Sequence, residues 1–163
     1  MNCRHCDKEL ENTLIDLGSS PPSNSYLTEE SIKLPEKRYP LKVLVCSNCW
    51  LVQTVDFVGV DEMFSSDYAY YSSYSSSWLS HSENYAKKVI QRFNLDSLSN
   101  VIEIASNDGY LLQYFKNSNI PCFGIEPTAG PAFKARGRGL EVIEEFFGED
   151  LATDLVEKNR QAD

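Results

Sequence analysis

The sequence lacks any hydrophobic run that approaches the ~20 apolar residues needed to cross a membrane. Basic residues are also scarce, with 15 lysines and arginines against 24 acidic residues and a net charge of -9. They form no cluster that could neutralise nucleic-acid phosphates. The opening MNCR leads into charged side chains, without the apolar core of an export signal. We therefore expect a cytoplasmic protein that binds neither membranes nor nucleic acid.

Cysteine is the residue type that stands out among those present. Four of the five cysteines form two CxxC pairs, and two such pairs can complete a closed, tetrahedral zinc site of the structural kind. Two disulfides or four free thiols are the alternative, and a protein that is not exported disfavours disulfides. The fifth cysteine, Cys122, lies in an apolar segment and is expected to be a core thiol. The expected zinc ligands are Cys3, Cys6, Cys46 and Cys49.

The first part of the chain has the pattern of a small β-ribbon around this metal. Alternating apolar residues followed by a Gly-Ser-Pro turn predict a short strand and a loop within residues 10–27. Strands are also expected at 39–45 and 51–55, on either side of the second CxxC pair, with a turn or short helical piece at 57–63. We place the zinc-binding domain at residues 1–70.

In the remaining part of the chain, residues 71–163, helical and strand patterns alternate, which predicts a parallel, doubly wound sheet. The expected fold is therefore α/β, a zinc-binding β-ribbon module followed by an incomplete Rossmann-like domain. The expected helices are 77–93, 110–115, 131–136 and 149–159, and the expected strands are 101–105, 121–125 and 140–143.

The turn after the first of these strands has the features of a cofactor site. Asn107-Asp108-Gly109 leads into a helix, where backbone N–H groups can meet a ligand, and Gly109 leaves out a Cβ that would push the ligand away. Glu126 ends the next strand, where a Rossmann-type fold places an acid against ribose hydroxyls; a solvated strand-end carboxylate is the alternative. The candidate cofactor residues are Glu103, Ala105, Asn107, Asp108, Gly109, Glu126 and Pro127.

The loop does not carry the GxGxxG pattern of a dinucleotide site. Position 105 is alanine and position 107 is asparagine, which leaves one glycine. Because a cofactor without a pyrophosphate needs no glycine-rich cradle, this loop favours S-adenosylmethionine over NAD.

A tyrosine- and serine-rich segment, SSDYAYYSSYSSSWLSHS, lies between the two parts of the chain. A low-complexity linker would rarely carry so many aromatic rings, because exposing them to water is unfavourable. Tyrosine combines an apolar ring with a hydroxyl group, which suits contact with a polar, ring-shaped ligand. Ligand contact and packing between domains both remain open.

Six motifs give the chain a specific resemblance: CRHC, DLGSSPPSNSYL, YPLKVLVCSNCWLVQ, MFSSDYAYYSSYSSSWLSH, EIASNDGYLLQYF and GIEPTAGPA. The chain resembles the N-terminal portion of the zinc-containing, S-adenosylmethionine-dependent C-methyltransferases of deoxysugar biosynthesis. The resemblance implies methylation of a nucleotide-linked keto-deoxysugar at the carbon beside the ketone. It also implies that Tyr68, Tyr70 and Tyr74 could hold the sugar or its enolate oxygen.

The resemblance further implies that part of the enzyme is missing. Members of the family have a complete methyltransferase domain and a further C-terminal Rossmann-like domain, and their catalytic Glu-His pair has no counterpart here. His81 does not correspond to that histidine and is only a secondary candidate for the base. We therefore expect a truncated methyltransferase domain that transfers no methyl group by itself. The alternative is a non-catalytic zinc-ribbon interaction module with a degenerate Rossmann-like extension.

Overall fold

The computed structural model describes residues 1–163 except 56, 60–62 and 65–67. The chain divides into two compact units, residues 1–65 and 66–163. This boundary lies earlier than the one we placed after residue 70. The reason is that backbone groups of Tyr70 and Ser72 hydrogen-bond to the side chain of Asn107, deep in the second unit. Part of the predicted turn at 57–63 falls outside the described residues.

The first unit is an antiparallel sheet in the order β1-β2-β3, in which β2 and β3 form the predicted hairpin. Its strands are β1 (Asn12–Ser20), β2 (Tyr39–Val45) and β3 (Val52–Thr54), and the short helix η1 covers Ser31–Lys33. The described part of β1 is exposed along its whole length. The buried apolar cluster of this unit consists of Cys3, Leu10, Leu44 and Cys46. Half of that cluster is cysteine, so the metal site lies at its centre.

The second unit is a parallel sheet in the order β4-β5-β6, which confirms the predicted Rossmann-like pattern. Helices alternate with strands along the chain, and each expected element is present to within a few residues. The short helix η2 covers Ser72–Tyr74. The strands are β4 (Val101–Ile104), β5 (Cys122–Ile125) and β6 (Glu141–Ile143), and the helices are α2 (Ser76–Phe93), α3 (Leu112–Asn117), α4 (Ala129–Gly137) and α5 (Glu149–Glu157).

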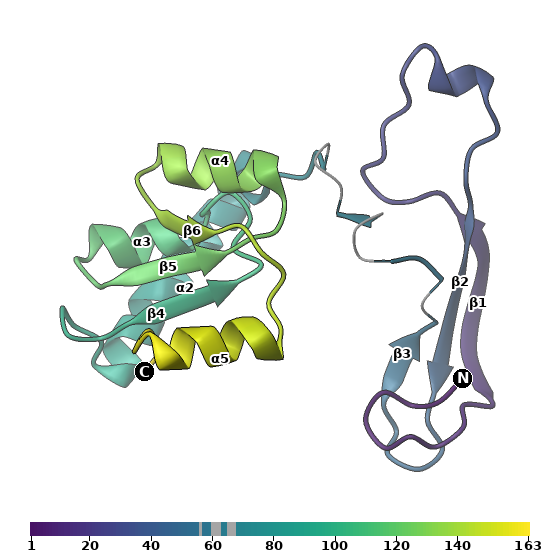
Figure 1. Cartoon of the computed structure of the whole chain (residues 1–163), viewed down its shortest axis with the longest axis horizontal. Helices are drawn as coiled ribbons and strands as arrows, with labels where there is room; N and C mark the ends of the chain where they lie inside the picture. The colour runs from purple at the N-terminus through teal and green to yellow at the C-terminus, as the bar shows by residue number, and fades with distance from the viewer. Residues whose placement is uncertain (56, 60–62, 65–67) are drawn as a thin grey trace. The chain divides into compact units, whose positions relative to one another are not determined.

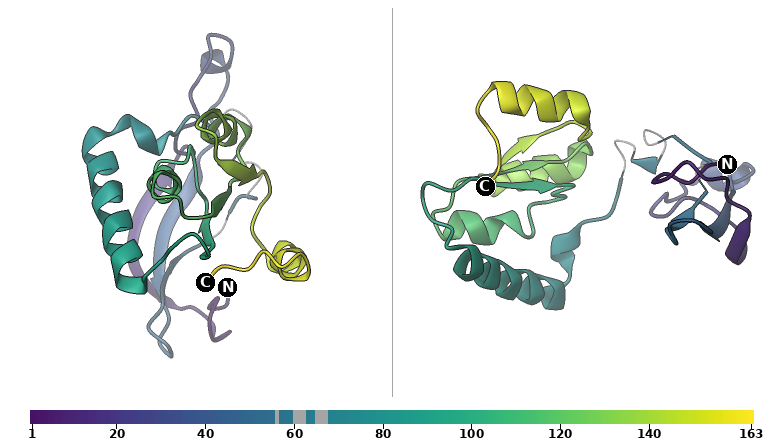
Figure 2. Two further views of the ribbon diagram at one scale, coloured as in Figure 1. Left: turned by 90° about the vertical axis from the view of Figure 1, so that its left-hand side faces the viewer. Right: turned by 90° about the horizontal axis from the view of Figure 1, so that it is seen from below.

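Helices cover both faces of this sheet, α5 on one side and α2 and α3 on the other (Figure 2). Successive residues of a strand point to opposite faces. Phe123 and Ile125 of β5 therefore pack with Leu151 and Leu155 of α5. On the other face, Leu112 of α3 packs with alanines of α4. This two-sided packing fixes the carboxyl ends of β4 and β5 side by side, where the candidate cofactor turn lies.

Helix α2 begins and ends with residues suited to those positions. The Oγ of Ser75 accepts a hydrogen bond from the N–H of Trp78 at 3.2 Å, an N-cap, and Asn94 ends the helix in the left-handed conformation.

Among the described residues, no helix is long and apolar enough to cross a membrane.

Candidate functional site

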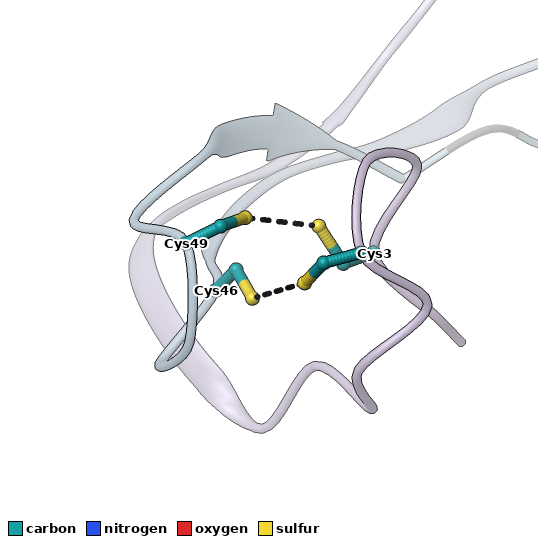
Figure 3. A group of neighbouring side chains, drawn as sticks. Cys3, Cys46 and Cys49 are labelled. Atoms are coloured by element: carbon teal, nitrogen blue, oxygen red, sulfur yellow. Dashed lines mark hydrogen bonds between the residues drawn. The ribbon is translucent and has the colours of Figure 1, made fainter.

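The four paired cysteines come together in the first unit. Their sulfur atoms all lie within 4.8 Å of one another, with Cys3 3.6 Å from Cys49 and Cys6 3.5 Å from Cys46 (Figure 3). A disulfide bond would place two sulfurs about 2.05 Å apart, so these cysteines are free thiols. Four convergent thiolates are the ligand set of a closed structural zinc site.

The two CxxC turns have the same backbone design. The residue after each pair, Asp7 and Trp50, has a positive φ of 58° and 63°. Its N–H donates to the carbonyl of the first cysteine of the turn, to Cys3 at 3.0 Å and to Cys46 at 3.1 Å. The backbone N–H of His5 lowers the pKa of the Cys3 thiol to about 6, which favours the thiolate that a metal requires. Both turns thus direct their sulfur atoms toward one point.

Gln53 is a further residue of this site that the sequence analysis missed. It is buried in β3 between two exposed neighbours, and its Nε2 donates to the Sγ of Cys3 at 3.3 Å. Its Oε1 accepts from the N–H of Arg4, inside the first CxxC turn, at 3.1 Å. The sequence does give one indication of Gln53: it is a polar residue at a strand position where alternation predicts an inward-facing side chain.

Replacing Gln53 with leucine should weaken zinc binding by about 10–100-fold, the usual effect of losing a residue that orients a metal ligand. The thiolate of Cys3 would lose a donor and the first turn would lose its tie to β3. Competition with a chromophoric chelator measures the affinity. Val52→Thr, an exposed position of the same strand, is the control. Equal affinities for the Gln53 variant and the unmodified protein would contradict this role.

The candidate cofactor turn lies in the second unit, where β4 leads into α3. Ala105, Asn107 and Gly109 have positive φ values of 57°, 48° and 77°. Every second residue of the turn thus has a left-handed backbone conformation. The N–H of Ser106 donates to the carbonyl of Ile125 at 3.2 Å, which ties the turn to the end of β5. The turn and the acid that follows β5 therefore form one structure.

Glu126 is the centre of that structure. It is 5% exposed, so it is not the solvated carboxylate that was the alternative interpretation. Its Oε2 accepts from the N–H of Asn107 at 2.9 Å. Its Oε1 accepts from the N–H of Thr128 at 2.9 Å and from the hydroxyl of the same residue, across the half-buried Pro127. A carboxylate oxygen has room for further donors, so ribose hydroxyls could still bind here.

Glu103 contributes a second acid at the carboxyl end of β4. Burial raises the pKa of this carboxyl group to about 8. Hydrogen bonds from the backbone of Leu112 and from Tyr110 lower the pKa, but by less than burial raises it. Its Oε2 is buried and has no hydrogen-bond partner among the described residues. A buried acceptor without a partner is unfavourable, which indicates a place for a positively charged or donating ligand.

Asp108 is the third acid of the turn, and it is fully buried. Its Oδ2 accepts from the hydroxyl of Ser73 and lies 3.4 Å from Nη2 of Arg138, while Oδ1 has no partner in the described part of the chain. Arg138 also donates to the carbonyl of Asp108. Arg138 follows α4 and is distant in sequence from Asp108, so no sequence motif places the two together.

Gly109 is required for a different reason from the one we expected. A Cβ at this position would lie 2.2 Å from Cδ1 of Leu140 and 3.3 Å from Cβ of Ala135, and φ is +77°. The missing side chain therefore makes room for the protein's own core, at the junction of α3, α4 and β6. Clearance for a ligand is not what the geometry shows.

The predicted substrate tyrosines lie in the same unit as the turn. The pKa of Tyr68 is raised, mainly by burial and then by the negative charge of Glu126. The hydroxyl of Tyr68 is therefore close enough to Glu126 to be influenced by its charge. Tyr70 and Tyr74 are exposed, and Tyr74 receives a hydrogen bond from Lys134 at 2.8 Å. His81 stacks on Trp78 at 5.0 Å between ring centroids, on the exposed side of α2.

Comparison with known proteins gives two matches. Residues 3–64 match the family model Methyltransf_13, described as a zinc binding domain. The chain is 30% identical over 155 residues to the C-methyltransferase NovU of Streptomyces niveus, a match that covers 93% of this chain and 37% of that relative. Together with the four-cysteine cluster, the first match shows that residues 3–64 form a zinc-binding domain. The chain spans little more than a third of the length of the relative.

Proposed function

We propose that the chain belongs to the zinc-containing C-methyltransferases, to which its sequence is similar, and that its second unit binds S-adenosylmethionine for methylation of a nucleotide-linked keto-deoxysugar. The observation that carries the proposal is the set of three acids, Glu103, Asp108 and Glu126, around one turn. The zinc site has a structural role, since four thiolates leave no open position for chemistry.

The charge of the turn supports S-adenosylmethionine over a dinucleotide. A pyrophosphate would bring negative charge toward three carboxyl groups, two of which have a buried oxygen that no described residue hydrogen-bonds. S-adenosylmethionine instead carries a sulfonium and an ammonium group, and its ribose hydroxyls could donate to Glu126. The orphaned oxygens of Glu103 and Asp108 thus fit a cationic ligand.

The keto-deoxysugar substrate is what the family resemblance implies, and it suits the chemistry of carbon methylation. A carbon nucleophile forms when a base removes the proton beside a ketone, and the enolate needs a hydrogen-bond donor at its oxygen. The hydroxyls of Tyr68, Tyr70 and Tyr74 are donors of this kind in the second unit. Carbon methylation of a keto-deoxysugar is therefore the proposed reaction of the whole protein.

We propose a division of labour in which residues 1–163 bind the cofactor but do not catalyse transfer by themselves. In the described part of the second unit, His81 is the one histidine, and it lies stacked against Trp78 on exposed α2. Losing a positioned base typically costs ~10²–10⁴ in rate. A non-catalytic interaction module is the second candidate function. In that case, the turn would bind no adenosyl ligand.

The proposal predicts that the ligand releases a proton from Glu103. The raised pKa, about 8, keeps this group mostly protonated at pH 7 when the site is empty. A cation beside it favours the ionised form, so binding at pH 7 should release about one proton. Affinity should rise as the pH approaches 8 and change little above it.

Calorimetric titration with S-adenosylmethionine, which carries the sulfonium charge that S-adenosylhomocysteine lacks, counts the protons released when it is done in buffers of different ionisation enthalpy. The Glu103→Gln variant is the matched control, because it keeps the shape of the side chain and cannot ionise. We expect release from the unmodified protein and none from the variant. Binding without proton release, or equal release from both proteins, would show that the ligand's charge does not meet Glu103.

A further inference from the structure

Asn107 joins residues 70–73, here called the tyrosine segment, to Glu126, the acid that follows β5. Its Nδ2 donates to the carbonyl of Tyr70 at 3.0 Å, and its Oδ1 accepts from the N–H of Ser72 at 2.8 Å. Its own N–H donates to Oε2 of Glu126 at 2.9 Å. The side-chain amide is therefore occupied by the tyrosine segment, while the backbone is bound to the candidate ribose acid.

Arg138 makes a second connection between the same two parts. Its Nη2 donates to the Oγ of Ser73 at 2.7 Å and lies 3.4 Å from Oδ2 of Asp108. The hydroxyl of Ser73 in turn donates to that same Oδ2. Because the Asp108 side chain is fully buried and the hydrogen bonds are charge-assisted, they are stronger than ordinary surface contacts.

Helix α4 holds the segment from a third direction. The Nζ of Lys134 lies 4.5 Å from the centre of the Tyr71 ring and 4.7 Å from that of Tyr74. A Cβ at Gly130 would come within 2.8 Å of the Tyr71 hydroxyl, so the segment packs closely on the first turn of the helix.

We infer that Asn107, Asp108 and Arg138 are positioning residues that clamp residues 70–73, and with them the substrate tyrosines, onto the cofactor turn. The identity of the ligand rests on the proposed function. Since Asn107 contacts both Glu126 and the segment, binding at Glu126 and ordering of the segment are coupled. Such coupling is reciprocal, so the ligand stabilises the clamp as much as the clamp favours the ligand.

The amide of Ser72 reports the clamp directly, because its N–H is bonded to Asn107. We expect its hydrogen exchange in the ligand-free chain to become about tenfold faster in Arg138→Met and in Asn107→Ala. Arg136→Met is the matched control: this arginine lies near the same end of α4 but pairs with Glu144. Ser73→Ala is a milder variant that decides the matter if Arg138→Met fails to fold.

S-adenosylhomocysteine should slow exchange at Ser72 in the unmodified protein, and Arg138→Met should bind this ligand about tenfold more weakly. Unchanged Ser72 exchange in Arg138→Met and Ser73→Ala would overturn the clamp. Faster exchange with unchanged affinity would overturn the coupling. Absence of binding to the unmodified protein would instead refute the proposed function, and ligand-free exchange would still decide whether the clamp exists.

Discussion

Removing zinc with a chelator is expected to unfold residues 1–65 and leave residues 66–163 folded. Among the described residues of the first unit, the buried cluster consists of two cysteines and two leucines, which is too little apolar surface to order the sheet without a metal. Zinc binding by four thiolates contributes about 10–16 kcal/mol in small domains of this kind. Amide exchange along β2 and β3, compared with exchange along β4 and β5, measures the two units separately.

Cys46→Ser should have the same effect as the chelator, because it removes a fully buried ligand. Cys122→Ser is the control, since Cys122 lies in β5 and outside the metal cluster. The expected result is loss of protection in β2 and β3 only for Cys46→Ser. Protected β2 and β3 amides in metal-free protein would refute a folding role for zinc.

Gly109→Ala should destabilise the second unit by roughly 2–5 kcal/mol, from backbone strain at a positive φ and overpacking. The new Cβ would lie 2.2 Å from Cδ1 of Leu140, which is itself buried. Loss of cofactor binding by such a variant would then follow from unfolding, and a larger residue such as valine would be worse.

Urea unfolding, followed by the helical signal of the second unit, measures this effect. Gly137→Ala is the control, because a Cβ there would meet no atom within 4 Å and φ is not in the left-handed region. We expect a stability close to that of the unmodified protein for Gly137→Ala. Equal midpoints for the two variants would show that Gly109 is not needed for packing.

Local patterns in the sequence were sufficient to predict most of the fold. Strand β2 covers the predicted residues 39–45, and the alternation of helices and strands predicts the parallel sheet that β4, β5 and β6 form. The CxxC spacing likewise predicts the cysteine cluster, because each pair is a local turn. Each strand, helix and CxxC turn depends on residues that are close in sequence, although the cysteine cluster joins residues 40 and 46 positions apart.

The parts that were missed depend on contacts between distant residues. Gln53 and Arg138 bind groups some 50 and 30 positions away, at Cys3 and Asp108, and no local pattern identifies these partners. The packing role of Gly109 depends on where Leu140 lies once β6 is in place. Such residues can be identified only from the three-dimensional structure, whereas the spacing of residues in the sequence predicts the turns that they support.

If the acidic turn of the second unit is an S-adenosylmethionine site, the chain should bind S-adenosylhomocysteine, and calorimetric titration measures this binding. We expect one binding site per chain, with binding weakened by about 1–3 kcal/mol in Glu126→Ala, the scale of a lost charge-assisted hydrogen bond. No binding to the unmodified chain, or equal binding to both proteins, would contradict this assignment.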